Sequence, residues 1–246
     1  MKKVILAGGF GKMGIEIQAT LAKAPDLELV GIFSATKRPA DVPVFTDLAA
    51  IDVTADVWID VTRPDVVLAN AQYALTNGMD IVIGTSGLSA EQVVELDAVA
   101  QAHNQHGIVV PNFSLSAVLL MRFASEAAKY FVDAEVLEIH HPGKLDAPSG
   151  TAKATAALIG AARTGTPAAP VSTDAARGDL IAGVPVHAMR LPGYVAEEEV
   201  VFGAPGETLR IKQTSFSRES FMGGVVLAAQ NVAQLTGVQV GLDKLL

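Results

Sequence analysis

Residues 4–14 read VILAGGFGKMG, and this stretch predicts how the chain begins to fold. Its four leading apolar residues are typical of a buried strand, and a helical pattern follows from about residue 12 to residue 23. Between the two elements the glycines are spaced as G-x-x-G-x-x-G, with Phe10 where the more common G-x-G-x-x-G motif has glycine. Glycine lets the backbone approach a phosphate, and the free N–H groups of the helix start can bind it. The stretch therefore predicts dinucleotide binding, with a ligand-free tight turn as the competing interpretation.

Strand and helix patterns alternate over the first 110 residues. After the strand at residues 4–7, further strands are predicted at residues 27–33, 57–61, 81–84 and 108–110, and helices at residues 64–77 and 89–105. Such alternation predicts a parallel sheet, because each helix carries the chain back to the same edge by a right-handed crossover. A Rossmann-type α/β domain is therefore expected for residues 1–111.

The pattern changes in the second half of the chain. Helices are predicted at residues 115–131, 150–159 and 217–235, and strands at residues 136–141, 186–191, 199–202 and 208–213. The last three strands follow one another without a helix, which predicts a mixed sheet with one open face. Residues 161–179 are rich in Ala, Thr, Pro and Gly and are predicted to form a loop. We expect a smaller α+β substrate domain at residues 112–217, with residues 218–246 returning to the dinucleotide domain.

The composition excludes several classes of protein. The chain has 18 Lys and Arg residues against 26 Asp and Glu residues, a net charge of −8, and no basic stripe of the kind that binds nucleic acid. It has no cysteine, so it has no disulfide, thiolate metal site or thiol nucleophile. The apolar start is too short for a signal peptide, and no stretch of about 18 uncharged apolar residues predicts a membrane span. A cytoplasmic location is expected.

The segment after the second predicted strand bears on the choice of cofactor. A site that prefers NAD usually has Asp or Glu there, which binds the ribose hydroxyls. Residues 33–38 instead read FSATKR. Their hydroxyls and two cations suit the 2′-phosphate of NADPH, and Lys12 is expected to reach the same region. NADPH is therefore expected to be preferred, with NADH as the alternative, and a solvated turn is the competing interpretation of Lys37 and Arg38.

Residues 138–151, EIHHPGKLDAPSGT, contain the densest chemistry of the chain. His140 and His141 lie at a strand end, and a histidine can donate a proton near neutral pH. Lys144 supplies a point charge for a carboxylate, and the helix start at Ser149-Gly150-Thr151 can bind an anion. The segment predicts a pocket for a small, multiply anionic substrate that takes up a proton.

Simpler interpretations of the same residues remain open. One histidine could lie in the core or on the surface, since neighbours on a strand point to opposite faces, and Ser149 could be only a helix N-cap. A two-histidine metal site lacks a third ligand at a familiar spacing, so no metal is expected. The concentration of these residue types in so short a segment favours a functional site.

The run His140-His141-x-x-Lys144-x-Asp146 through Thr151 resembles the signature of the 4-hydroxy-tetrahydrodipicolinate reductases, formerly called dihydrodipicolinate reductases, of bacterial lysine biosynthesis. The resemblance extends over most of the chain, through the stretches at residues 8–14 (GGFGKMG), 60–64 (DVTRP), 84–87 (GTSG), 112–114 (NFS) and 218–224 (RESFMGG). Val61 replaces the usual Phe, residues 190–199 lack a histidine that is common in the family, and the chain is somewhat short.

The resemblance implies a reductase that passes a hydride from NAD(P)H to a small cyclic dicarboxylate imine bound between its domains. It implies that His140 is the general acid, acting with Lys144, and that the substrate is bound by His141, Lys144, Ser149, Gly150 and Thr151. The residues predicted to bind the cofactor are Gly8, Phe10, Gly11, Lys12, Met13, Ser34, Thr36, Lys37, Thr62, Gly84, Thr85, Asn112, Phe113, Arg218 and Phe221. It also implies a homotetramer assembled through the second domain.

Two other functions fit part of the sequence. Another two-domain imine reductase, of the aspartate-dehydrogenase type, would keep the domain order, but the segment at residues 140–151 argues against it. A non-catalytic NADP(H)-sensing regulator would keep the glycine loop, but it would need neither an acid nor a carboxylate clamp. Consumption of NADPH distinguishes the regulator from an enzyme.

Overall fold

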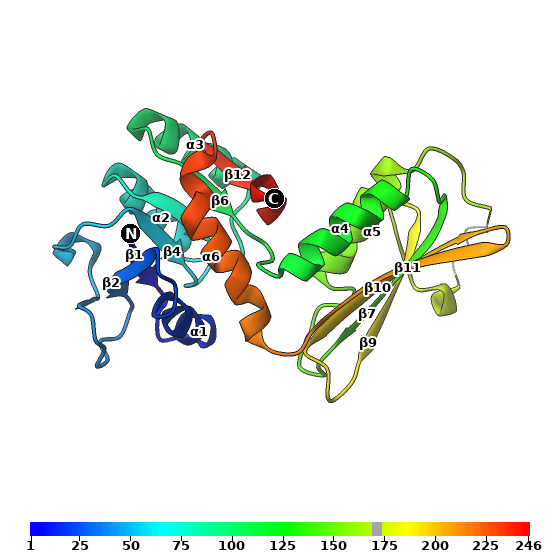
Figure 1. Ribbon diagram of the computed structural model, residues 1–246, viewed down its shortest axis with the longest axis horizontal. Coiled ribbons are helices and arrows are strands. Elements are labelled where there is room, and N and C mark those ends of the chain that lie inside the picture. The colour runs from blue at the N-terminus through cyan, green and yellow to red at the C-terminus, as the bar shows by residue number, and fades with distance from the viewer. Residues whose placement is uncertain (169–173) are drawn as a thin grey trace. The chain divides into compact units, whose positions relative to one another are not determined.

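The computed structural model describes residues 1–168 and 174–246, and the chain divides into two compact units (Figure 1). The first unit comprises Met1–Phe113 together with Arg218–Leu246, and the second comprises Ser114–Ser217. The C-terminal segment thus belongs to the same unit as the glycine loop. None of the helices in the described ranges is long and apolar enough to cross a membrane.

The first unit is built on a seven-stranded parallel sheet, in the order β12-β6-β5-β4-β1-β2-β3. The strands are β1 (Lys2–Ala7), β2 (Leu27–Phe33), β3 (Val44–Phe45), β4 (Val57–Asp60), β5 (Asp80–Ile83), β6 (Gly107–Val109) and β12 (Val238–Val240). The helices are α1 (Lys12–Leu21), α2 (Val67–Thr76), α3 (Ala90–His103) and α6 (Met222–Asn231), with 3-10 turns η1 (Leu48–Ala50), η3 (Arg218–Phe221), η4 (Val232–Gln234) and η5 (Leu242–Leu245). The predicted Rossmann-type sheet is confirmed.

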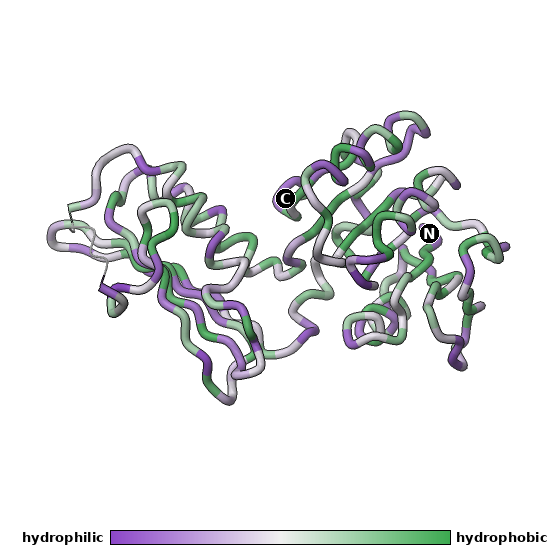
Figure 2. Tube along the Cα trace, turned by 180° about the vertical axis from the view of Figure 1, so that it is seen from behind, coloured by the Kyte–Doolittle hydropathy of each residue, from purple (hydrophilic) through white to green (hydrophobic). Residues whose placement is uncertain are grey.

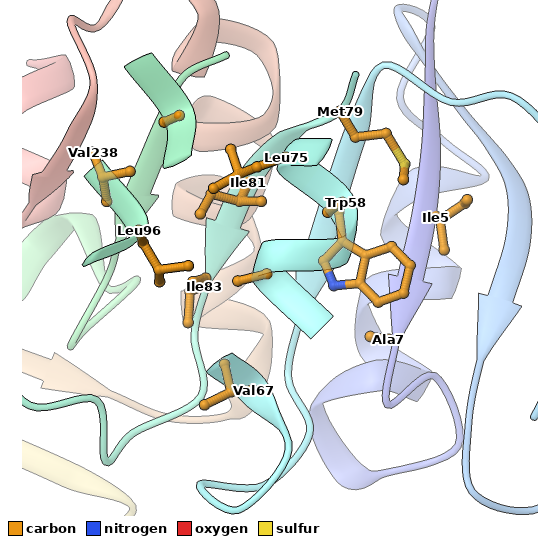
Figure 3. Packing of buried hydrophobic residues seen from close by; sticks show 13 residues of the cluster. Ile5, Ala7, Trp58, Val67, Leu75, Met79, Ile81, Ile83, Leu96 and Val238 are labelled. Atoms are coloured by element: carbon orange, nitrogen blue, oxygen red, sulfur yellow. The ribbon is translucent and has the colours of Figure 1, made fainter. Parts of the chain in front are cut away.

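The core of this unit explains why its central strands are nearly all apolar. Every residue of β4 and β5 is buried, as expected for parallel strands with helices on both faces. The Trp58 ring packs in this core among residues from β1, β5 and α2, and Figure 3 shows it near Ile5 and Leu75. The exceptions to the apolar pattern are Asp80 at the start of β5 and Asp60 at the end of β4, of which Asp60 is fully buried.

The second unit has a mixed five-stranded sheet in the order β11-β10-β7-β9-β8. Strands β7 and β9 are parallel and the other neighbours are antiparallel, which confirms the predicted mixed sheet. The elements are α4 (Leu115–Ala127), β7 (Asp133–His140), α5 (Gly150–Ala162), η2 (Ala175–Arg177), β8 (Asp179–Ile181), β9 (Val184–Arg190), β10 (Ala196–Ala204) and β11 (Glu207–Ser215).

Helices α4 and α5 cover one face of the mixed sheet. Val136, Val200 and Phe202 from the strands pack there against Ala124 and Ala156 from the helices. Along β7, buried residues therefore alternate with partly exposed ones, and Figure 2 shows both hydrophilic (purple) and hydrophobic (green) stretches in the strands of this sheet.

Some predicted elements differ from the structure. The single helix predicted at residues 217–235 is wrong, because this segment consists of η3, α6 and η4 in succession. The short strands β3, β8 and β12 were not predicted, since two or three residues carry no periodic pattern. The loop predicted at residues 161–179 in fact includes the end of α5, η2 and the start of β8, and its residues 169–173 lie outside the described part.

Candidate active site

The glycine loop lies between β1 and α1 and packs tightly against the turn that follows β4. Gly8 has φ +86°, and a β-carbon there would lie 2.5 Å from the carbonyl oxygen of Val61. A β-carbon at Gly14 would lie 2.2 Å from the carbonyl oxygen of Gly8. Gly11 is the N-cap of α1 and is exposed, so the N–H groups at the helix start are not covered by a capping side chain. This cradle fits the pyrophosphate of a dinucleotide.

Phe10 of this loop lies beside the cationic segment after β2. The guanidinium carbon of Arg38 is 5.7 Å from the centroid of the Phe10 ring, within the range of a cation–π contact. Lys12 at the start of α1 is exposed, as are Thr36 and Lys37. The predicted 2′-phosphate residues Thr36, Lys37 and Arg38 therefore lie at the surface, and the contact of Arg38 with Phe10 places this segment beside the glycine loop.

Buried Asp60 organises the loops that follow β4 and β5. Its Oδ1 accepts hydrogen bonds from Thr62 Oγ1 at 2.6 Å and Thr85 Oγ1 at 2.7 Å. Its Oδ2 accepts one from Asn70 Nδ2 at 2.9 Å and one from Trp58 Nε1 at 3.2 Å. Thr62 and Thr85, two of the three threonines predicted to bind the cofactor, thus donate their hydroxyl protons to Asp60, which fixes the two loops at the carboxyl edge of the sheet. Sequence reasoning gave Asp60 no such role.

Other residues predicted to bind the cofactor also belong to the first unit. A β-carbon at Gly84 would lie 2.5 Å from the Phe113 ring, and one at Gly224 would lie 2.1 Å from the Phe113 carbonyl oxygen. Phe113 is therefore held between the loop after β5 and helix α6. Met13 and Asn112 are half-buried. Arg218 and Phe221 begin and end η3, which contacts α1.

The predicted proton donor and carboxylate clamp come together around a carboxylate that was not predicted. Glu138 in β7 is fully buried, and its Oε2 lies 2.6 Å from Nδ1 of His140. Arg190 at the end of β9 donates from Nη1 to Oε2 at 2.7 Å and from Nη2 to Oε1 at 2.9 Å. The backbone N–H of Ser149 donates to Oε1 at 3.0 Å. One carboxylate thus joins the strand end, the neighbouring strand and the start of α5.

The surroundings shift the pKa values of this pair. Burial raises the pKa of Glu138, but the hydrogen bonds from Arg190, His140 and Ser149 outweigh it, so the pKa is lowered and the carboxylate is ionised. Burial lowers the pKa of His140, and the positive charges of Lys144 and Arg190 lower it further against the opposing effect of Glu138. His140 therefore favours its neutral form in the absence of an anion.

The loop between β7 and α5 carries the remaining clamp residues. Lys144 Nζ forms an ion pair with Asp146 Oδ1 at 2.7 Å, and the Lys144 side chain is only 23% exposed. His141 is exposed, and its carbonyl oxygen accepts from the backbone N–H of Lys144 at 3.1 Å, which closes a turn. Ser149 is the N-cap of α5, with Oγ accepting from the Ala152 N–H at 3.1 Å. Gly150 is exposed and Thr151 half-buried in the first turn.

Ser149 is an N-cap, as the simpler interpretation has it, and its backbone N–H also donates to Glu138. Within residues 1–168 and 174–246 no group of three or more His, Cys, Asp or Glu side chains is arranged to hold a metal ion. Glu138 could have been found in the sequence, because it lies two residues before His140 and strand side chains two apart share a face. Arg190 had no local signal, since it lies 52 residues from its partner.

Both parts of the chain match one protein family. Residues 2–113 match the family described as Dihydrodipicolinate reductase, N-terminus, and residues 116–246 match Dihydrodipicolinate reductase, C-terminus. The chain belongs to the dihydrodipicolinate reductase family. The predicted family is therefore confirmed, and with it the predicted class of nicotinamide-dependent reductase.

Individual relatives agree with this membership over the full length of the chain. The 4-hydroxy-tetrahydrodipicolinate reductase of Lactiplantibacillus plantarum is 46% identical, with 100% of both chains covered, and that of Streptococcus gordonii is 43% identical, with 99% of both covered. The solved dipicolinate-bound dihydrodipicolinate reductase of Paenisporosarcina sp. is 37% identical, covers 100% of both chains and has a TM-score of 0.91. An engineered D-amino acid dehydrogenase bound to NADP+, at 16% identity and a TM-score of 0.61, shares the fold alone.

Proposed function

We propose that this chain reduces 4-hydroxy-tetrahydrodipicolinate to tetrahydrodipicolinate in the diaminopimelate route of lysine biosynthesis. The reaction consumes NAD(P)H and one proton and releases NAD(P)+ and water. Family membership and full-length relatives of that name support the reaction. The observation that carries it in this chain is the joining of His140, the Lys144 loop and the start of α5 through Glu138 and Arg190.

The clamp is proposed to recognise the two carboxylates of the substrate. The N–H groups of Gly150 and Thr151 and the hydroxyl of Ser149 lie at the start of a helix of 13 residues, where the helix dipole favours an anion. Lys144 adds a formal positive charge and His141 an exposed ring on the same loop. Together these groups bind and orient a small dicarboxylate, whereas a regulator that only senses NADP(H) has no use for them.

His140 is proposed to donate the proton. It ends β7, so its ring lies at the start of the loop that bears the clamp. When bound, the dihydronicotinamide supplies the hydride, and His140 holds the proton that completes the reduction. The approach of a doubly charged anion favours the protonated imidazole, which compensates for the lowered pKa of His140 in the free protein.

NADPH is proposed as the preferred cofactor, and NADH as a usable one. The support is the exposed cationic segment that contains Lys37 and Arg38, with Arg38 stacked on Phe10 of the glycine loop. A guanidinium suits a phosphate because it can donate two parallel hydrogen bonds. No acidic side chain stands among residues 33–38 to select the unphosphorylated ribose.

A homotetramer and a cytoplasmic location are proposed as well. The face of the mixed sheet that α4 and α5 leave uncovered carries Leu137, Pro185 and Val201, which line a cavity of about 420 Å³. A sheet face that mixes these apolar residues with charged ones such as Glu135 and Arg210 can be buried by a second copy of the chain. Light scattering of the purified protein tests the assembly, since a monomer in solution would contradict it. Cell fractionation tests the location.

The reaction itself is tested by following NADPH and NADH absorbance. The substrate is generated in situ by the condensation of pyruvate with aspartate semialdehyde. Consumption that requires both precursors is expected, and it should be faster with NADPH. Binding of NADPH without consumption would instead support a non-catalytic sensor.

A further inference from the structure

Glu138 and Arg190 lie behind the proposed proton donor, and we propose that they are positioning residues, which fix the ring nitrogen of His140 that serves the substrate. This inference rests on the proposed function, because it concerns the proton that His140 supplies. Neither residue was singled out by the sequence motifs, and each acts through His140 and the clamp loop.

Each oxygen of the Glu138 carboxylate faces two hydrogen-bonding groups, and this arrangement fixes which of them donate. Oε2 faces Nδ1 of His140 and Nη1 of Arg190, and Oε1 faces Nη2 of Arg190 and the N–H of Ser149. Three of these four groups can only donate, because a guanidinium and a backbone N–H have no acceptor. The carboxylate is therefore filled by donors when it is ionised, and Nδ1 of His140 must donate as the fourth.

This arrangement sets the tautomer of His140. With the proton on Nδ1, the neutral imidazole keeps its lone pair on Nε2, and Nε2 is then the nitrogen that takes up and gives away a proton. The His140 side chain is 16% exposed, whereas Glu138 is not exposed at all, so the ring leads outward from the buried carboxylate. The contact with Glu138 therefore leaves Nε2 of His140 as the ring nitrogen that faces away from the core.

Arg190 extends the same control to the clamp. Its Nη2 also donates to the carbonyl oxygen of Asp146 at 2.6 Å, and its Nε donates to that of Lys144 at 3.3 Å. These bonds hold the loop that carries Lys144, while Glu138 holds the N–H of Ser149. The Glu138–Arg190 ion pair thus holds the proton donor, the Lys144 loop and the start of α5 in place.

The register of the sheet places a second buried glutamate beside Glu138, and only one of the two is held ionised. Glu198 of β10 lies directly opposite Glu138 and is also buried. Burial raises the pKa of Glu198 to about 7, with the charge of Glu138 adding to the rise. Only Glu138, which has the guanidinium, is held ionised next to His140. The desolvation of a buried ion pair can cancel its attraction, so the Glu138–Arg190 pair need not stabilise the fold. We therefore favour a role for this pair in orienting His140.

The same sheet offers a matched control on its other face. Glu135 of β7 also bridges a histidine and an arginine: its Oε2 lies 2.7 Å from Nε2 of His187, and its other oxygen accepts from Arg177. This triad has the same chemistry but no clamp loop. Glu135→Gln therefore reports the general cost of removing such a carboxylate, once its assembly state is shown to be unchanged.

Two measurements test the positioning role. The first is the ¹⁵N spectrum of His140 in the wild-type protein above the pKa of the ring, assigned with His140→Gln. A proton on Nδ1 is expected, and a neutral ring protonated on Nε2 would overturn the proposal. This readout needs neither substrate nor a folded variant at Glu138.

The second measurement compares the turnover of Glu138→Gln with that of Glu135→Gln. The amide replaces one oxygen by a donor, and each oxygen faces two donors, so either orientation loses two hydrogen bonds. We expect kcat to fall about 10- to 100-fold with little change in KM, and the pH profile of kcat to shift. Arg190→Lys should lose less activity than Arg190→Met, because it keeps the charge. Glu135→Gln should match the wild type.

The outcomes separate this proposal from the function on which it rests. If the wild type turns over and Glu138→Gln keeps its kcat and pH profile, the positioning role is wrong and the proposed function stands. If the wild type shows no turnover, the proposed function fails, and the tautomer seen in the ¹⁵N spectrum still supports or overturns the positioning geometry.

Discussion

Nδ1 of His140 lies 2.6 Å from Oε2 of Glu138, a carboxylate that is wholly buried in the mixed sheet. Burial lowers the pKa of His140, and the nearby cations add to this effect, so the imidazole is largely neutral in the free protein at neutral pH. If His140 is the proton donor, its neutral ring has to take up a proton when the anionic substrate binds.

Binding of a dicarboxylate is therefore expected to take up a proton. The two negative charges raise the pKa of His140, so at about pH 7.5 binding of dipicolinate should draw up to about one proton per chain. Calorimetry in buffers with different ionisation enthalpies measures this number. His140→Gln should abolish the uptake, and equal uptake by the variant would show that another group titrates.

Replacing Lys144 by Ala is expected to weaken both substrate binding and turnover. A charge-assisted hydrogen bond contributes about 1.5–3 kcal/mol, so kcat/KM should fall about 10- to 100-fold. Lys129→Ala is the matched control, because Lys129 also pairs with a carboxylate, that of Glu126 at 2.6 Å. Steady-state kinetics on the two variants test this prediction. Equal kcat/KM for Lys144→Ala and Lys129→Ala would contradict the proposal that Lys144 binds a substrate carboxylate.

Glu198 is expected to make the protein less stable as the pH rises. Burial raises its pKa from 4.5 to about 7, so the folded chain holds this proton more tightly than the unfolded chain. The stabilisation is complete below pH 4.5 and is lost as the pH rises through 7, with a size of about 3 kcal/mol. Denaturant unfolding of Glu198→Gln, followed by circular dichroism, should therefore lack this part of the pH dependence.

The comparison isolates Glu198 from the other groups that titrate in the same window. Both proteins retain Glu138, whose lowered pKa gives stability that is lost only at lower pH, and both retain His140. Glu207→Gln, at the exposed start of β11, serves as the control for the loss of a carboxylate. Parallel stability curves for Glu198→Gln and the wild type would show that Glu198 is ionised in the fold.

Removing the cations beside Phe10 is expected to act on NADPH more than on NADH. The double change Lys37→Ala and Arg38→Ala should raise the KM for NADPH about tenfold more than that for NADH, equivalent to about 1.4 kcal/mol. Lys23→Ala, exposed just beyond α1, controls for loss of surface charge. An equal rise for both cofactors would mean that these cations do not bind the 2′-phosphate.

The fold was predictable where the pattern is local. The buried strands β1, β4 and β5 each contain a continuous apolar run, and the run that ends β1 leads directly into the glycine loop. Strand β12 was not predictable in the same way, since its three residues are strands only because they pair with β6. The change from η3 to α6 between Phe221 and Met222 likewise has no periodic signal in the sequence.

The candidate site likewise contains residues that a local sequence pattern predicts and residues that only the pairing of distant strands brings together. His140, Lys144 and Ser149 fall in one short segment, so their chemistry could be inferred from the residue types. Arg190 reaches Glu138 only because β9 pairs in parallel with β7, in a register that places it opposite His140. Sequence spacing does not show such a partner, and the family resemblance marked residues 190–199 only as a departure.

The central claim is that His140 supplies the proton in reduction of a dicarboxylate imine, and the kinetics of His140→Gln test it most directly. His103→Gln, on the exposed end of α3, is the matched control. The account predicts that kcat of His140→Gln falls about 10²- to 10⁴-fold with a modest change in KM, while His103→Gln matches the wild type. A change in KM alone, with kcat preserved, would contradict it.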